Sequence, residues 1–343
     1  MKLQNNLKYA DEDGGDIEHP LVSIVILNWN GEKCIRDCLD SVLRTEYPSF
    51  EVIVVDNAST DGSKDLIKNL YPQVKLIENR ENLGWCIGNN IGIKEAKGDI
   101  IVLLNNDTIV DKNWIKEIVN EARNPDVGVI GCRLYFPNTN VIQSFGFRKI
   151  SLEIYENIGG GQVDNGQLND IRDVDYVSGA AMAIKMEVLE KVGLLDPNLN
   201  AFHTDVDLCL RAKKAGYRVV MSNAKVYHYG SFSWNKFPIR KILFFHKDRL
   251  YFIRKHYAPR ILLQYLLLEQ LKEFKYNLIR YLKKETVLQR LNSLGLEKEG
   301  KKLIKSAIEI VLLNYTLFIV ALFAYMFRGR KLKRRLVEFR DVI

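Results

Sequence analysis

The chain has 343 residues, of which 47% are apolar and 27% are charged. This composition excludes a disordered, collagen-like or coiled-coil protein, and the length suits one large α/β domain with an appendage. The five cysteines show no CxxC spacing, which excludes a disulfide framework or zinc ribbon and favours a reducing compartment. Residues 1–20 are polar and acidic, a pattern that predicts no signal peptide.

Charge is divided unevenly along the chain. The segment from Trp234 onward holds 25 basic and 9 acidic residues, whereas the preceding residues hold 25 basic and 33 acidic ones. A basic tail of this kind usually faces an anionic membrane surface or nucleic acid. Because the body is acidic, we expect a membrane surface as the partner and no nucleic acid.

The first 110 residues predict a parallel sheet. Apolar runs at 21–27, 51–55, 74–77 and 100–104 predict buried strands, and helical stretches separate them, including one at 90–96. Continuous apolar strands between helices are typical of an α/β fold with a parallel sheet covered on both faces.

Polar clusters follow three of these strands, at Asn28–Asn30, Asp56–Asp61 and Asn105–Asp107. Ligands of open parallel sheets bind at the carboxyl ends of the strands, so the clusters predict a binding site. Within it, Asp56 is placed to receive a nucleotide base and Trp29 offers a flat face for stacking. Asp107 supplies a hard oxygen ligand for Mg²⁺ or Mn²⁺.

Two common nucleotide-binding patterns are missing from the sequence. No GxGxxG follows the first strand and no GxxxxGK[ST] is present. Dinucleotide oxidoreductases and P-loop enzymes are therefore disfavoured, and a nucleoside diphosphate held by a metal is the remaining prediction.

The second half of the chain is less regular. Residues 125–175 give no clear strand pattern, a helix is expected from Asp205 to Gly216, and short strands are expected at 217–220 and 224–227. We expect a polar extension at 1–19, a catalytic domain at 20–237 and a basic helical region at 238–343.

The apolar segment 307–327 contains one charged residue, Glu309, and is long enough to span a membrane. Because basic residues flank it on both sides, we favour a helix that lies in or against the cytoplasmic leaflet. A buried helix of a helical subdomain is the alternative.

The sequence resembles glycosyltransferase family 2, which has the GT-A fold, and within it a rhamnosyltransferase-like branch. The resemblance covers about residues 20–235 and is carried by the runs VSIVILNWNG, EVIVVDNASTDGS, ENLGWCIGNN, IVLLNNDT and VSGAAMAIKMEVLEKVGLLDPNLNAFHTDVDLCLRAKKAGYRVVMSNAKVYHYGS. It implies an α/β GT-A domain with a mostly parallel central sheet flanked by helices. The C-terminal helical membrane-associating region, which we expect from the basic tail and its apolar segment, lies beyond the resemblance.

The resemblance also implies roles for individual residues. Contacts with the nucleotide sugar are implied for Leu27, Asn28, Trp29, Asn30, Asp56, Asn82, Gly84, Asn105 and Asn106. Contacts with the donor or acceptor sugar are implied for Gly179, Ala180, Thr204 and Asp207. Asp107 and His228 match the metal ligands, and Asp205 matches the general base of inverting transfer.

The sequence departs from the family pattern at two places. Asn105 and Asn106 stand where many members have a second acid, and Thr204 replaces the glutamate that precedes the base. Asp207 has an alternative role, because an acid in the first turn of a helix commonly caps or orients that helix.

We therefore expect an inverting glycosyltransferase at the cytoplasmic face of the cell membrane, with dTDP-rhamnose as the favoured donor and a lipid-linked or cell-surface glycan as the acceptor. A positioned carboxylate would remove the proton of the acceptor hydroxyl, and the metal would stabilise the charge on the diphosphate. The alternatives are a catalytically inactive protein that binds sugar nucleotides or acts as a scaffold, and a nucleotidyltransferase.

Overall fold

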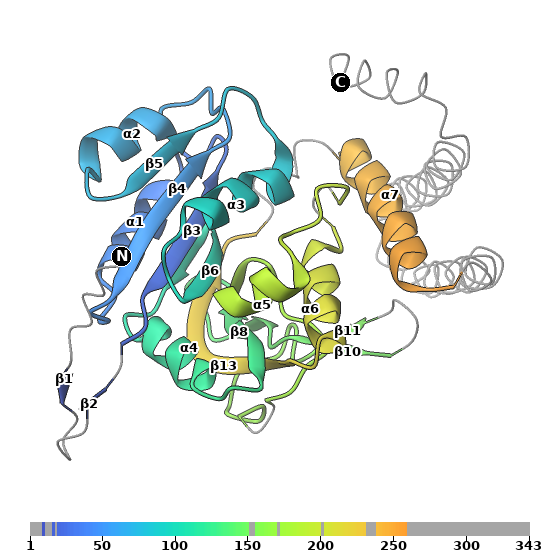
Figure 1. Cartoon of the computed structure of the whole chain (residues 1–343). Helices are drawn as coiled ribbons and strands as arrows, with labels where there is room; N and C mark the ends of the chain where they lie inside the picture. The colour runs from blue at the N-terminus through green and yellow to red at the C-terminus, as the bar shows by residue number, and fades with distance from the viewer. Residues whose placement is uncertain are drawn as a thin grey trace, which may run out of the picture. The chain divides into compact units, whose positions relative to one another are not determined.

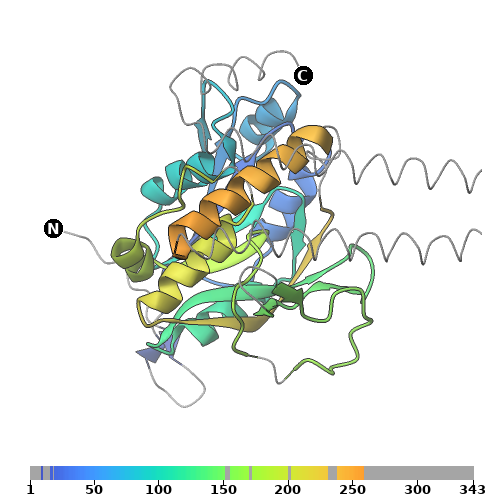
Figure 2. The same ribbon diagram turned by 90° about the vertical axis from the view of Figure 1, so that its right-hand side faces the viewer.

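The computed structural model describes residues 9–10, 16–17, 19–150, 155–169, 172–199, 202–230 and 238–258. The chain divides into two compact units, Met1–Lys236 and Phe237–Ile343. In the described part of the first unit, helices α1 to α6 lie on both faces of a nine-stranded sheet (Figures 1 and 2).

The strands of this sheet follow the order β5-β4-β3-β6-β12-β8-β13-β7, with β9 paired to β8. They are β3 (Val22–Asn28), β4 (Phe50–Asp56), β5 (Lys75–Glu78), β6 (Ile100–Asn105), β7 (Thr108–Val110), β8 (Val127–Tyr135), β9 (Ile142–Ser144), β12 (Ala181–Lys185) and β13 (Arg218–His228). Two antiparallel pairs lie outside it: β1 (Tyr9–Ala10) with β2 (Asp16–Ile17), and β10 (Phe147–Lys149) with β11 (Tyr155–Asn157).

The helices of this unit alternate with the strands from β3 to β6. They are α1 (Ile35–Leu43), α2 (Ser63–Leu70), α3 (Gly84–Glu95), α4 (Trp114–Ala122), α5 (Met186–Val192) and α6 (Thr204–Lys214). The predicted α/β class is confirmed, because β5, β4, β3 and β6 pair in parallel.

The expectation of a mostly parallel sheet was wrong for the second half. Strand β12 runs antiparallel to both β6 and β8, and β7 runs antiparallel to β13, so the sheet is mixed. Strand β8, fully buried over Val127–Tyr135, lies in the stretch that the sequence predicted to be irregular. The sequence did not predict this strand because it contains glycines, which are uncommon in strands. Close packing requires glycine at position 128, since a Cβ there would lie 2.7 Å from the Tyr217 Cβ.

Two further boundaries differ from the prediction. Helix α3 begins at Gly84 and not at Asn90, and Gly88 within it lies so close to Leu27 that a Cβ would come within 2.4 Å of a Leu27 methyl group. The two short strands expected at 217–227 form one strand, β13, whose pairing with β8 is irregular between Met221 and Lys225.

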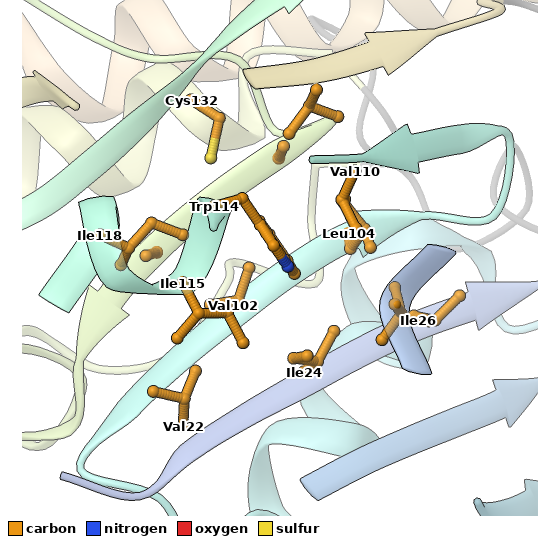
Figure 3. Close-up of a cluster of buried hydrophobic side chains, with 14 of the residues drawn as sticks. Val22, Ile24, Ile26, Val102, Leu104, Val110, Trp114, Ile115, Ile118 and Cys132 are labelled. Carbon is orange, nitrogen blue, oxygen red and sulfur yellow. The ribbon is translucent and has the colours of Figure 1, made fainter. Parts of the chain in front are cut away.

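The larger hydrophobic core lies between the sheet and helices α1, α2 and α4 (Figure 3). Trp114 of α4 is fully buried among side chains that include Val102 and Leu104 of β6, and its indole N–H donates to Thr45 Oγ1 at 2.9 Å. On the opposite face α3 packs closely, since a Cβ on Gly92 would lie 2.3 Å from a Val25 methyl carbon. The helices cover both faces of the sheet, and the polar clusters lie at the edge formed by the carboxyl ends of its strands.

The second unit is described over one helix, α7 (Pro238–His256), which carries six lysines or arginines and one aspartate. No helix in the described ranges combines the length and apolarity that a membrane crossing requires. The predicted apolar segment 307–327 and most of the predicted region 238–343 lie outside the described residues.

Candidate active site

The side chain of Asn28 joins the ends of three strands. Asn28 and Asp56 are register partners at the ends of β3 and β4, and the Asn28 Nδ2 donates to Asp56 Oδ2 and Ser63 Oγ, each at 2.9 Å. Its Oδ1 accepts a hydrogen bond of 2.9 Å from Nδ2 of Asn106, just beyond β6. The predicted clusters after β3, β4 and β6 therefore meet through one fully buried amide.

Asp56 is buried at this junction and accepts hydrogen bonds from two of its neighbours. The residue is 1% exposed, and its Oδ1 accepts the backbone N–H of Ser59 while Oδ2 accepts the Asn28 amide. These hydrogen bonds order the loop after β4, and contact between Asp56 and a nucleotide base stays a prediction. Trp29 is half-buried and Asn30 is exposed, with the Asn30 Oδ1 accepting the backbone N–H of Thr60 at 2.8 Å.

Asn57 connects the end of β4 to the predicted Asn82–Gly84 element, a role that the sequence interpretation missed. Its Oδ1 accepts from Asn79 Nδ2 at 2.9 Å, and its Nδ2 donates to Asn82 Oδ1 and to the carbonyl oxygen of Gly84, each at 3.2 Å. Asn82 Oδ1 also accepts the Gly84 N–H at 2.9 Å. Asn57 is 1% exposed, so this connection is internal.

The two predicted metal ligands face each other although they are far apart in the sequence. Asp107 Oδ1 lies 3.2 Å from His228 Nε2, and Asn105 Nδ2 lies 3.3 Å from the same nitrogen. The pairing of β13 with β7 holds them together, because His228 is the register partner of Thr108 and the Tyr229 N–H donates to the Asp107 carbonyl oxygen. Among the described residues, no group of three or more His, Cys, Asp or Glu side chains is arranged to hold a metal. A bound ion would therefore take its remaining ligands from substrate or water.

Asp205 lies in the first turn of α6, where two backbone N–H groups hold its carboxylate. Gly179 N–H donates to Oδ2 at 3.1 Å and Val206 N–H donates to Oδ1 at 2.9 Å. Burial raises the pKa of Asp205 above its ordinary value, and these hydrogen bonds oppose that rise only in part. The result is a fixed carboxylate with increased proton affinity, which is what a general base requires.

The indole of Trp85 packs near Gly179, the residue whose N–H donates to the Asp205 carboxylate, and the sequence interpretation missed it. A Cβ built on Gly179 would lie 3.2 Å from the Trp85 Cη2 and Cζ2 atoms and 3.6 Å from the Asp205 Cβ. Of the other residues predicted to contact sugar, Ala180 and Thr204 are 5% and 3% exposed, and the Ala180 carbonyl oxygen accepts the Asn105 N–H.

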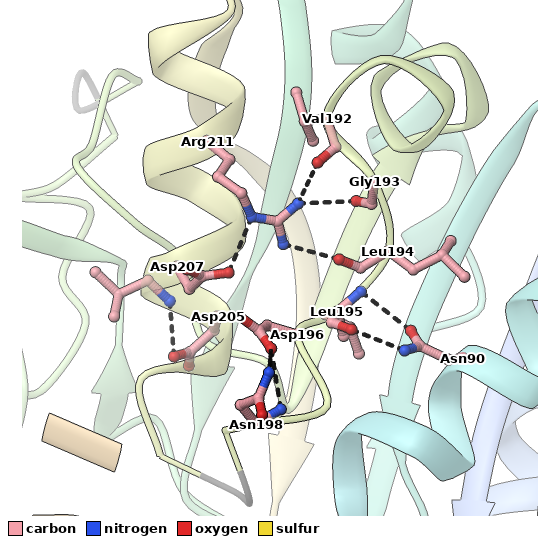
Figure 4. A network of polar contacts seen from close by, with 11 residues as sticks. Asn90, Val192, Gly193, Leu194, Leu195, Asp196, Asn198, Asp205, Asp207 and Arg211 are labelled. Atoms are coloured by element: carbon pink, nitrogen blue, oxygen red, sulfur yellow. Dashed lines mark hydrogen bonds and ion pairs between the residues drawn. The ribbon is translucent and has the colours of Figure 1, made fainter. Parts of the chain in front are cut away.

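Asp207 takes part in a different network (Figure 4). It is fully buried, and its Oδ2 accepts from Arg211 Nε at 2.9 Å. The Arg211 guanidinium also donates to three carbonyl oxygens of the turn after α5, those of Val192, Gly193 and Leu194. This ion pair supports the helix-orienting role, and contact between Asp207 and a sugar stays a prediction.

The fold is shared with solved enzymes of the GT-A class. The mannosyltransferase PcManGT of Pyrobaculum calidifontis, solved in complex with GDP-Man and Mn²⁺, superposes with a TM-score of 0.59 at 18% identity. The superposition covers 88% of this chain and 87% of that one. The superposition therefore shows that the chain has a GT-A-like fold.

Sequence comparisons place the chain within this class. Residues 23–193 match the model of glycosyl transferase family 2. The O-antigen biosynthesis protein RfbC of Myxococcus xanthus is 30% identical over 224 residues, which cover 62% of this chain and 18% of RfbC. The glycosyltransferase AglE of Haloferax volcanii is 26% identical over 209 residues, which cover 60% of this chain and 65% of AglE. Residues 23–193 therefore form a domain that matches glycosyltransferase family 2, and the match spans less than two thirds of either relative.

Proposed function

We propose that this chain transfers a sugar from a nucleotide-diphospho-sugar to a glycan acceptor with inversion at the anomeric carbon. Asp205 accepts the proton of the acceptor hydroxyl as that oxygen attacks the anomeric carbon from the face opposite the diphosphate. The bond between the sugar and the diphosphate breaks, and the nucleoside diphosphate leaves. A positioned general base of this kind contributes about 10²–10⁴-fold to the rate.

The observation that carries the proposal is the facing pair Asp107 and His228. A carboxylate oxygen and an imidazole nitrogen 3.2 Å apart fit two adjacent ligands of an octahedral ion, whose bonds of about 2.1 Å place such ligands about 3 Å apart. Two protein ligands leave room for diphosphate oxygens. Because imidazole is a softer ligand than the oxygens that Mg²⁺ prefers, we propose Mn²⁺ ahead of Mg²⁺. When bound, the ion stabilises the negative charge that develops on the leaving diphosphate.

The proposed donor rests on the family resemblance, and the proposed acceptor rests on one relative. The resemblance to a rhamnosyltransferase-like branch supports a pyrimidine nucleotide sugar, with dTDP-rhamnose tested first, and the similarity to an O-antigen biosynthesis protein supports a glycan acceptor. A lipid-linked or cell-surface glycan would suit an enzyme held at the cytoplasmic face of the membrane. Helix α7 exposes Lys247, Arg254 and Lys255, which supports attraction to an anionic surface.

A donor panel tests the proposal. The full chain is incubated with Mn²⁺ or Mg²⁺, membrane lipid extract and dTDP-rhamnose, UDP-sugars or GDP-mannose, and the released nucleoside diphosphate is measured. Asp107→Ala and Asp205→Asn are compared with Asp37→Asn, a matched control that alters an exposed acid in the first turn of α1. We expect metal-dependent release from one donor by the wild type and the control, and loss of release in the two site variants.

Other outcomes identify the alternatives. Nucleotide binding without turnover of any donor, in the presence of lipid extract, would favour an inactive sugar-nucleotide-binding or scaffold protein. Release of pyrophosphate from a nucleoside triphosphate and a sugar phosphate would favour a nucleotidyltransferase. Full turnover by Asp205→Asn would overturn the role of that carboxylate as the base.

A further inference from the structure

Gln143, on the short strand β9, makes two hydrogen bonds to His228 in opposite directions. Its Nε2 donates to the backbone carbonyl oxygen of His228 at 3.1 Å, and its Oε1 lies 2.7 Å from the ring nitrogen Nδ1 of the same residue. The two residues are separated by 85 positions in the sequence. We propose that Gln143 is a positioning residue that presents the Nε2 lone pair of His228 to the divalent metal, an inference that depends on the proposed metal centre.

The backbone contact fixes the orientation of the Gln143 amide. A carbonyl oxygen accepts hydrogen bonds and never donates them, so the amide group that faces the His228 carbonyl must be the NH₂ group. The other end of the amide is then the oxygen, which also only accepts. His228 must therefore carry a proton on Nδ1 and donate it to Gln143 Oε1.

This assignment determines what the opposite nitrogen of the ring can do. A neutral imidazole with its proton on Nδ1 has an unshared electron pair on Nε2. That nitrogen faces Asp107 Oδ1 at 3.2 Å, so two electron-rich atoms point toward each other, an arrangement that a cation stabilises. The Nδ2 group of Asn105, 3.3 Å from Nε2, is a donor and agrees with an unprotonated Nε2.

Gln143 is itself held in place. Its neighbours Ile142 and Ser144 are buried, and β9 pairs with the end of β8. The backbone carbonyl oxygen of Gln143 accepts a hydrogen bond of 2.8 Å from Asn157 Nδ2. A fixed partner on the second ring nitrogen sets the orientation and tautomer of a metal-binding histidine, and its loss typically lowers metal affinity about 10–100-fold.

The test measures Mn²⁺ binding to the full chain. Binding is monitored by the electron paramagnetic resonance signal of free Mn²⁺, first without a nucleotide and then in the presence of UDP. The variants are Gln143→Leu, which removes both hydrogen bonds, and Gln143→Glu, which restores an acceptor for Nδ1. Gln162→Leu is the matched control, because Gln162 is an exposed glutamine with no hydrogen bond to His228. Asp107→Ala marks the metal centre itself.

We expect Gln143→Leu to bind Mn²⁺ about 10–100-fold more weakly, Gln143→Glu to recover most of the affinity, and Gln162→Leu to match the wild type. Nitrogen-15 spectra of histidine-labelled protein should show His228 protonated on Nδ1 in the wild type, and a shift toward the Nε2-protonated form in Gln143→Leu. This spectral change would not arise from a merely structural role.

Different results would overturn the metal centre and the positioning role of Gln143. If the wild type binds Mn²⁺, Asp107→Ala does not and Gln143→Leu binds as tightly as the wild type, the role of Gln143 is overturned while the metal centre stands. If the wild type binds no Mn²⁺, or Asp107→Ala binds it equally well, the metal centre and this role of Gln143 are both overturned.

Discussion

Gly31 occupies a position where a single added methyl group would disturb the junction of the three strand ends. A Cβ there would lie 2.2 Å from Asn28 Oδ1 and 2.3 Å from Asn106 Nδ2, the two atoms that share a hydrogen bond of 2.9 Å. Ordinary contact begins at 3.4 Å, so each amide must move by more than 1 Å. Asn28 is fully buried and tied to Asp56 and Ser63, so its movement disturbs those contacts as well.

The expected cost of Gly31→Ala follows from these contacts. Overpacking costs about 1–3 kcal/mol, and losing one hydrogen bond between buried amides adds about 1 kcal/mol. The restricted backbone of alanine in the unfolded chain offsets about 0.4–1 kcal/mol. A net loss of about 2 kcal/mol corresponds to a Tm lower by about 4–8 °C for a domain of this size.

Gly62→Ala is the matched control, because Gly62 also lies next to a site loop. Its φ is −73°, and the three atoms nearest to a Cβ there all belong to the carboxylate of Glu32, an exposed side chain that can move aside. We expect this variant to unfold at the wild-type temperature or up to a few degrees higher. Thermal unfolding followed by circular dichroism compares the two variants. Equal Tm values would refute the conclusion that the Asn28–Asn106 contact is tight and stabilising.

Three further variants test the surroundings of α6. Asp205→Asn should lower the transfer rate about 10²–10⁴-fold and leave the Tm at pH 7 unchanged or higher. The Tm can rise because burial raises the pKa of Asp205, so that ionisation of its carboxyl group opposes folding. Any such gain in Tm should vanish as the pH falls below the pKa of Asp205 in the unfolded chain. Trp85→Ala removes the indole that lies near Gly179, whose N–H binds the Asp205 carboxylate; if water then reaches Asp205, its pKa falls and the acid limb of the pH–rate profile moves to lower pH, whereas an unmoved limb would show that the indole does not contribute to the burial of Asp205. Arg211→Met should cost about 3–5 kcal/mol in urea unfolding, because it removes the cation that faces the buried carboxylate of Asp207; Arg211→Met combined with Asp207→Asn should recover part of that loss.

The first half of the fold and the meeting of the polar clusters were accessible from the sequence because each signal is local. Strands β3, β4 and β6 are continuous apolar runs, and the polar residues follow them directly. Parallel pairing then brings their ends to one edge without further information. The facing of Asp107 and His228 came from matching a family pattern, since no local rule connects residues 121 positions apart.

The remaining parts depend on contacts that leave no local pattern. Strand β8 contains Gly128, which packing against Tyr217 requires, and Gly131, which packing against Val177 and Met221 requires, so its sequence did not predict a strand. Gln143 reaches His228 only because β9 folds back along β8. Trp85 is one aromatic residue in a glycine-rich run, and its position near Gly179 follows from how α3 packs on the sheet. These residues are visible only when the long-range pairing is known.

The loops that border the site carry backbone strain that the fold supports. Asn30, Ala58 and His203 have φ values of 51°, 60° and 60°, in the left-handed region where non-glycine residues cost about 1–3 kcal/mol each. At Ala58 two hydrogen bonds of the next residue compensate for the strain. The Ser59 N–H donates to Asp56 Oδ1, and Ser59 Oγ accepts the Asn30 N–H at 2.9 Å. His203 immediately precedes α6, so the strained turn sets where the helix begins and thereby the place of Asp205 in its first turn. Strain of this kind persists only where surrounding contacts over-determine the backbone. The buried amide of Asn28, which donates to Asp56 Oδ2 and Ser59 Oγ, supplies such contacts without adding charge.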